Sequence, residues 1–194
     1  AEKQFRQPLA YGGQRPLYAT RTVTGSGAVI VGYEGKPMAR ITRLTTGRVV
    51  DFGIKDANNM GASMAPAAAH TISQHLKDFE EEPEAYDRIF TGDLGQYGLQ
   101  LAGELVERDG YDIKDRLSDC GLIVYDRESQ DVHAGGSGCG SSALKLVNYI
   151  LPAMMEGQYR KVLFVPTGAL LSPLSTQQGE SIPGIAQAVV LEAV

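Results

Sequence analysis

Short apolar runs and longer apolar stripes at helical spacing alternate along this chain, and they predict the order of its elements. Runs of Val, Ile, Leu and Phe are typical of buried strands, whereas apolar residues every three or four positions favour helices. The predicted strands are 28–31, 38–52, 87–91, 121–125, 161–165 and 186–194. The predicted helices are 62–79, 94–108 and 144–156. Residues 1–25 and 166–184 have no sustained pattern, so we expect loops there.

From residue 38 onward this order alternates strands with helices and ends on two strands with no helix between them. Helical connections between strands imply right-handed crossovers and a mostly parallel sheet. The segment 144–156 is apolar on nearly every side, which is typical of a helix buried within a layered domain. We therefore predict an α/β fold with a mixed five-stranded sheet, helices on both faces, and one of the last two strands antiparallel at an edge.

A glycine-rich loop, residues 133–143, directly precedes the apolar helix. It contains Gly135, Gly136, Gly138 and Gly140, and glycine costs backbone entropy in both helices and strands. A loop of this kind offers free backbone N–H groups and the positive end of a helix dipole to an anion or oxyanion. The alternative interpretation is a tight connection with close helix–sheet packing.

The composition and charge of the chain argue against several classes of function. The chain has 194 residues, enough for one domain with a real core, and its net charge of −5 argues against nucleic-acid binding. No apolar run reaches membrane-spanning length and no secretory signal is present, so we expect an intracellular location. Cys120 and Cys139 lack paired ligand spacing, and His70 and His75 are five apart, so no metal or cofactor is expected.

Three residues near predicted strand or helix ends are candidates for chemistry. Asp93 follows a strand and precedes Gln96 by three positions, which resembles a capping box, although strand ends are also where α/β sheets bind ligands. His133 lies in the loop, where it could pair with a carboxylate. Cys139 is at a helix start, and we interpret it as a small core residue rather than a nucleophile.

Several sequence runs resemble one family. The runs are 1–6, 22–28, 133–142, 168–173 and 177–184. They resemble the stage V sporulation protein AD family, a branch of the thiolase-like superfamily, and the resemblance covers essentially the whole chain. It implies that residues 1–36 are the tail of an N-terminal thiolase-like half, contributing a loop and one strand. Residues 37–194 would then form the C-terminal thiolase-like half.

The resemblance also implies a function. Members of this family associate with the SpoVA membrane proteins of sporulating bacteria, bind dipicolinic acid (pyridine-2,6-dicarboxylate) and support its uptake into the developing spore. The resemblance further implies a location peripheral to the forespore or spore inner membrane, and it implies no cofactor. It also implies either a homodimer or pairing with the N-terminal half. Dipicolinate is a planar dianion that needs several coplanar donors, so the expected ligand-binding residues are His133, Gly135, Gly136, Ser137, Cys139 and Asp93.

The sequence departs from condensing relatives of the superfamily. Where their C-terminal half supplies a catalytic His, this chain has Gly92-Asp93, and where some place an Asn it has Gly135-Gly136-Ser137. We therefore expect a binding protein rather than an enzyme. Two alternatives stay open: an acyltransferase or condensing enzyme whose nucleophile lies in the N-terminal half, and a structural partner that serves as a docking surface.

Overall fold

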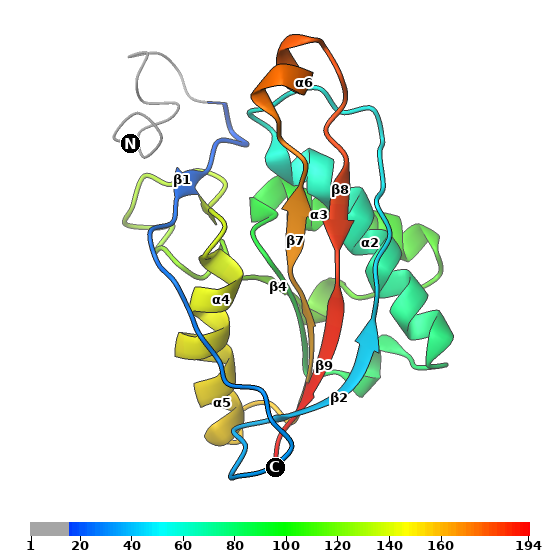
Figure 1. Cartoon of the computed structure of the whole chain (residues 1–194), viewed down its shortest axis with the longest axis vertical. Helices are drawn as coiled ribbons and strands as arrows, with labels where there is room; N and C mark the ends of the chain where they lie inside the picture. Colours follow the sequence, from blue (N-terminus) through cyan, green and yellow to red (C-terminus); the bar gives the residue numbers. More distant parts are fainter. Residues whose placement is uncertain (1–15) are drawn as a thin grey trace.

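Five strands form one mixed sheet in the computed structural model, which describes residues 16–194 (Figure 1). The strands, in spatial order, are β2 (Arg40–Thr45), β9 (Ala188–Glu192), β6 (Lys161–Val165), β3 (Arg88–Thr91) and β4 (Leu117–Asp119). β4, β3 and β6 run parallel to one another, whereas β9 is antiparallel to both β6 and β2. The predicted mixed five-stranded sheet is confirmed. The predicted antiparallel strand is not at an edge, because β2 pairs with its outer side.

Helices cover both faces of this sheet, as predicted (Figure 1). On one face lie α2 (Met60–Asp78) and α3 (Gly95–Arg108). On the other face a single helical rod comprises α4 (Ser141–Lys145), the π-helix η4 (Leu146–Ile150) and α5 (Leu151–Met155). Pro152 has no N–H to donate back into the preceding turn, which explains why the helix widens there.

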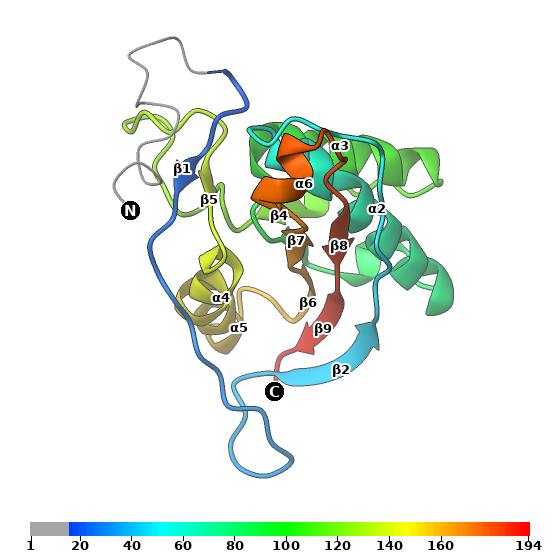
Figure 2. The same cartoon turned by 45° about the horizontal axis from the view of Figure 1, so that its top comes forward.

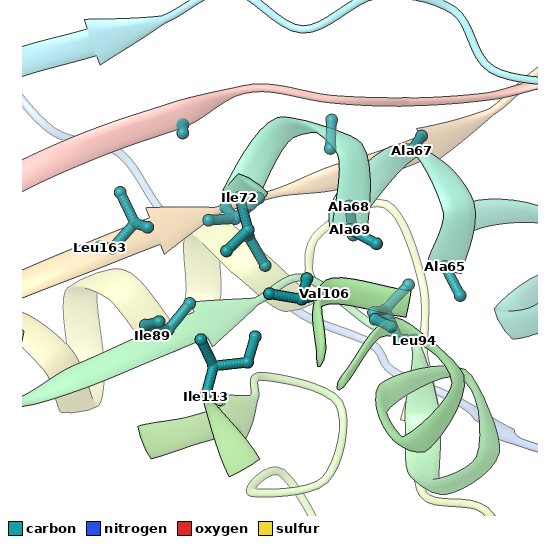
Figure 3. Close-up of a cluster of buried hydrophobic side chains, with 14 of the residues drawn as sticks. Ala65, Ala67, Ala68, Ala69, Ile72, Ile89, Leu94, Val106, Ile113 and Leu163 are labelled. Carbon is teal, nitrogen blue, oxygen red and sulfur yellow. The ribbon is translucent and has the colours of Figure 1, made fainter. Parts of the chain in front are cut away.

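The sheet separates two hydrophobic clusters because successive side chains of a strand point to opposite faces. In β3, Ile89 belongs to the cluster under α2 and α3, whereas Phe90 belongs to the cluster under α4 and α5. Figure 3 shows Ile72 of α2 beside Ile89 and Leu163 in the first cluster. Burial on both faces explains why these strands are continuous apolar runs.

Short elements complete the fold. The two-residue strands β1 (Arg21–Thr22) and β5 (Gly136–Ser137) pair in parallel, and β7 (Thr167–Ala169) pairs antiparallel with β8 (Gly184–Ala186). Between β7 and β8 lies α6 (Pro173–Gln177), so the predicted loop 166–184 contains structure (Figure 2). Two single-turn helices, η2 (Pro83–Ala85) and η3 (Lys114–Arg116), precede β3 and β4.

Two predicted strands are wrong. Residues 28–31 are irregular, and Ile30 and Val31 are exposed to 101% and 73%, because no described strand offers them an edge. Residues 121–125 form turns, and the third parallel strand is β4, which ends at Asp119. Residues 1–15, which include most of the predicted N-terminal loop, lie outside the described residues.

A polar network around Glu81 connects β2, β6 and the segment that precedes β3. Glu81 pairs with Arg43 of β2 and with Lys161 of β6 (2.6 Å), and it accepts a hydrogen bond from the Tyr86 hydroxyl. His75 joins the same network at 2.7 Å from Tyr86 Oη. Burial alone would raise the pKa of Glu81, but the hydrogen bonds from Arg43, Lys161 and Tyr86 lower it to about 2. His75 of α2 is therefore a fully buried, packed residue.

Truncating Ile72 tests the first hydrophobic cluster. Ile72 is fully buried, so Ile72→Ala should lower the free energy of unfolding by about 2–5 kcal/mol, since it removes buried methyl groups and leaves a cavity. The matched control is Ile41→Ala in β2, where the side chain is 47% exposed and the change should be within about 0.5 kcal/mol. Urea denaturation measures both variants, and equal losses would contradict this assignment of the core.

Candidate functional site

Polar residues gather where the parallel strands β3, β4 and β6 end. Thr91, the last residue of β3, lies opposite Asp119 of β4 on one side and opposite Val165 of β6 on the other. Gly92 and Asp93 continue from β3, and Thr167 follows β6 by two residues. Carboxyl ends of adjacent parallel strands meet at one edge, and open α/β sheets bind ligands there.

Asp119 is the buried centre of this edge. Its carboxylate accepts hydrogen bonds from Thr91 Oγ1 (2.7 Å) and from the backbone N–H groups of Leu94 (2.9 Å), Gly95 (3.3 Å) and Leu122 (3.2 Å). The N–H groups of Leu94 and Gly95 open helix α3, so Asp119 satisfies donors that have no intrahelical partner. The predicted capping box of Asp93 and Gln96 is wrong, because a residue distant in sequence caps this helix.

Asp93 instead turns toward the glycine-rich loop. Its Oδ2 accepts hydrogen bonds from Ser137 Oγ (2.8 Å) and from the Gly138 N–H (2.9 Å). Burial raises the pKa of Asp93, while these two bonds and the nearby Thr167 hydroxyl lower it, and burial prevails. The structure thus brings Asp93 together with Ser137 and Gly138, which follow it by 44 and 45 positions in the chain. Asp93 and Ser137 were both predicted as site residues.

The loop's own backbone is largely engaged. Gly135 has φ +105°, a conformation that favours glycine, and its N–H donates to the Val132 carbonyl (2.9 Å). The Gly136 N–H donates to the Gly121 carbonyl (2.8 Å). Together with Gly138, three backbone donors of the predicted anion cradle are bound by acceptors of the chain itself.

The N-terminal strand β1 covers this loop. The Arg21 N–H donates to the Gly135 carbonyl (2.8 Å) and the Val23 N–H to the Ser137 carbonyl (2.8 Å). Figure 2 shows β1 and β5 side by side above the start of α4. We call residues 16–27 the strap, and the strap holds the loop on the side away from the sheet.

The contacts of His133 and the exposure of Cys139 distinguish these two residues from the group formed by Asp93, Ser137 and Gly138. The His133 ring is 3.2 Å from both the Pro16 carbonyl oxygen and a carboxylate oxygen of Asp131, so the carboxylate pairing considered for His133 exists. Cys139 is exposed, which excludes the predicted role as a core residue. A role for either residue in ligand binding stays a prediction.

Sequence reasoning missed Asp119, Thr91 and Thr167. The signal was present in part: Thr91-Gly92-Asp93 and Ser118-Asp119-Cys120 are polar stretches that both follow apolar strand positions. Assigning the strand to 121–125 placed Asp119 before that strand rather than at the end of one.

A metal-binding group and a membrane-spanning helix are both absent from residues 16–194. No group of three or more His, Cys, Asp or Glu side chains in this range has the geometry to hold a metal ion. No helix in the same range has both the length and the apolar character needed to cross a membrane. A shallow polar hollow lined by Glu84, Asp112, Asp115 and Arg116 lies at the amino ends of β3 and β4, opposite the candidate site.

Fold and site together define an α/β protein with a polar cluster at its strand ends, and comparison with known proteins gives its family. The profile of stage V sporulation protein AD matches residues 1–192. Stage V sporulation protein AD of Bacillus subtilis (strain 168) is 48% identical over 192 residues, which are 99% of this chain and 56% of that protein. The chain therefore belongs to the stage V sporulation protein AD family, and it spans about half the length of this curated relative.

Two solved structures resemble the chain more distantly. The tetronic acid condensing enzyme AbyA1 is 15% identical, with a TM-score of 0.46 over 89% of this chain and 49% of that one. The 3-oxoacyl-[acyl-carrier-protein] synthase III from Aquifex aeolicus VF5 is 11% identical, with a TM-score of 0.42 over 82% of this chain and 46% of that one.

The protonation of Asp119 should appear in the pH dependence of stability. Burial raises the pKa of Asp119 from 3.8 to about 6, against hydrogen bonds from Thr91 and the α3 backbone that lower it. A raised folded-state pKa means that protonated Asp119 contributes stability below its ordinary pKa, and this contribution is lost as pH rises to about 6. Asp119→Asn stays neutral, so the stability of the wild type relative to this variant should fall between those pH values.

Urea denaturation of both proteins at several pH values measures this difference. Asp112→Asn, in an exposed position, is the control for a general effect of removing a carboxylate. A stability difference between the wild type and Asp119→Asn that does not change with pH would contradict a raised pKa.

Proposed function

We propose that this chain is the C-terminal part of a non-catalytic protein that binds dipicolinic acid and supports its uptake into the developing spore. The observation that carries the proposal is the composition of the strand-end cluster. It consists of hydroxyls, backbone N–H groups and two carboxylates around Gly92 and Asp93. Such groups bind and orient a polar ligand, whereas acyl transfer needs a nucleophile activated by a neighbouring base.

The histidines support a binding role. The His75 ring is hydrogen-bonded to Thr45 Oγ1 and to the Tyr86 hydroxyl, and the His133 ring contacts Pro16 and Asp131. Neither of these two rings has a hydrogen bond with a serine or cysteine of the strand-end cluster in residues 16–194. A proton-transfer partner for Ser137 or Cys139 is therefore not supplied by them.

The negative charge of Asp93 opposes the binding of an anion in this proposal. A dicarboxylate that approaches Ser137 and Gly138 meets the carboxylate that already accepts from them, and two like charges at one site repel. Burial raises the pKa of Asp93, and protonation of this residue would remove the like charge that an anion meets there. We infer that ligand binding is coupled to proton uptake at Asp93.

The exposed run 28–31 also has a role in this proposal. The apolar run 28–31 has high β-propensity yet is exposed, and an exposed run of this kind is an aggregation hazard unless it pairs with another strand. We propose that residues 28–31 pair with the sheet of an N-terminal half, which agrees with the chain's spanning 56% of its relative. The assembled protein would then lie peripherally at the forespore or spore inner membrane, bound to the SpoVA membrane proteins.

Calorimetric titration of the full chain with dipicolinate tests the proposal. We expect saturable binding that picolinate, which has one carboxylate fewer, does not reproduce. Ser137→Ala and His133→Gln should weaken binding, whereas Ser129→Ala, an exposed serine that bonds to Asp126, is the control. Turnover of an acyl-CoA without dipicolinate binding would favour the condensing-enzyme alternative and overturn the proposal.

Replacing Asp93 by asparagine tests the charge condition separately. Asp93→Asn keeps an oxygen that can accept from Ser137 and Gly138 but removes the negative charge, so the affinity for dipicolinate at neutral pH should rise about 10-fold, roughly 1.4 kcal/mol. Binding by the wild type should strengthen as pH falls, and binding by the variant should not. Weaker binding by Asp93→Asn would show that the carboxylate itself helps to hold the ligand.

A further inference from the structure

The edge strand β2 has only two side chains that are shielded from solvent, and both belong to the polar network around Glu81. β2 lies at the edge of the sheet, and within residues 16–194 its one strand partner there is β9 (Figure 1). Of its six residues, Thr45 is buried and Arg43 half-buried, whereas the other four are exposed. Thr45 Oγ1 lies 2.7 Å from Nδ1 of His75, and Arg43 pairs with Glu81. The network therefore ties this strand to helix α2.

The hydrogen bonds of the network determine where each proton lies. The Tyr86 hydroxyl donates to Glu81, whose lowered pKa keeps the carboxylate ionised. Tyr86 Oη has no second proton, so it accepts from His75 Nε2, which is 2.7 Å away. A neutral imidazole carries one N–H, so Nδ1 is the acceptor and receives the hydroxyl proton of Thr45. The neutral Nε2–H form of His75 therefore satisfies both of its neighbours.

A second proton on His75 would meet an unfavourable environment. The residue is fully buried, and burial is the main cause that lowers its pKa to about 4. The carboxylates of Glu81 and Asp78 raise the pKa of His75, whereas the cations Arg43 of β2 and Lys161 of β6 lower it. Arg43 and Lys161 already share the carboxylate of Glu81, so a charged imidazole would be a third cation beside it.

Displacement of β2 would relieve this conflict. A proton on Nδ1 would point at Thr45 Oγ1, which donates to that nitrogen in the neutral state. If β2 moves away, Thr45 and Arg43 leave the ring and water can hydrate the charged imidazole. The strands β9, β6 and β3 pair with one another without β2, so the rest of the sheet can stay intact.

We propose that His75 is a pH-sensitive switch for β2: the neutral ring keeps the strand on the sheet, and the protonated ring releases it. The switch involves no ligand, so it goes beyond the proposed function and does not depend on it. It acts on the strand that follows the strap in the chain.

The direction of the pH dependence follows from the two states of the strand. The released state binds a proton that the paired state does not, so release becomes easier as pH falls. With the ordinary His pKa of 6.5 in the released state and about 4 in the paired state, the population of the released state should rise about 10-fold per pH unit between these values. Asp119, in β4 at the opposite edge, changes global stability with the opposite sign, so a measurement on β2 itself is required.

Amide hydrogen exchange of the full chain, resolved by NMR between pH 7 and pH 4, tests this switch. After correction for the intrinsic exchange rates, protection of the β2 amides that pair with β9 should fall about 10-fold per pH unit below about pH 6.5. Dilute urea should leave this protection unchanged, because a local opening exposes little surface, and should reduce protection in β3 and β6. The ring nitrogen shifts of His75 at pH 7 should show the Nε2–H form.

Variants separate the switch from general instability. His75→Gln binds no proton in this range, so β2 protection should no longer depend on pH. Thr45→Val keeps the side-chain shape but removes the Nδ1 partner, and it should lower β2 protection at pH 7 about 10-fold. Thr42→Val, at an exposed position of the same strand, is the matched control and should leave protection unchanged.

Two results would overturn the proposal. One is β2 protection that does not change between pH 6.5 and pH 4. The other is protection of β2 that equals that of β3 and β6 at every pH and urea concentration, which would mean that β2 opens only when the whole chain unfolds. Both are read from the wild type, so the test stands even where His75→Gln does not fold.

Discussion

The carboxylate of Asp119 fixes the part of the molecule on which the candidate site depends. It is 1% exposed, and its four hydrogen bonds reach β3, the start of α3 and the turn after β4. A carboxylate in this environment loses much of its hydration, and the bonds offset that cost while they hold three segments at one point. With α3 capped by Asp119, the side chain of Asp93 is free to leave the helix and reach the glycine-rich loop.

The site therefore has a buried layer and an outer layer. Asp119 and Thr91 form the buried layer, which sets backbone positions. Asp93, Ser137, Ser142 and Thr167 form the outer layer, where hydroxyls and backbone donors gather around Gly92. The strap encloses the loop from the far side through β1. Under the proposed function, a ligand would replace hydrogen bonds of Asp93, whereas those of Asp119 would stay in place.

The sequence predicted those elements whose signal is local. Helices α2 and α3 and strands β3 and β6 follow from apolar spacing, and their observed bounds agree within two residues. It did not predict β4, because a three-residue strand with one apolar residue has little pattern, and the nearby apolar run 121–125 forms turns. The capping prediction for Asp93 was wrong although the local pattern was present. The Asp93 carboxylate accepts hydrogen bonds from Ser137 and Gly138, 44 and 45 positions away, instead of capping α3. Thr167 lies near Asp93 only because β3 and β6 are neighbours in the sheet, which no spacing in the sequence reveals.

The placement of β9 has a consequence for how the chain acquires its structure during synthesis. Among residues 16–194, β2 (residues 40–45) pairs within the sheet with β9 alone, and β9 spans residues 188–192. Until residue 192 has left the ribosome, β2 has no neighbour and β6 has one free side. Contacts of such high sequence separation form slowly, and the unpaired strands invite association with other chains. The five-stranded sheet of a nascent chain is therefore completed late, once β9 is available to pair with both β2 and β6.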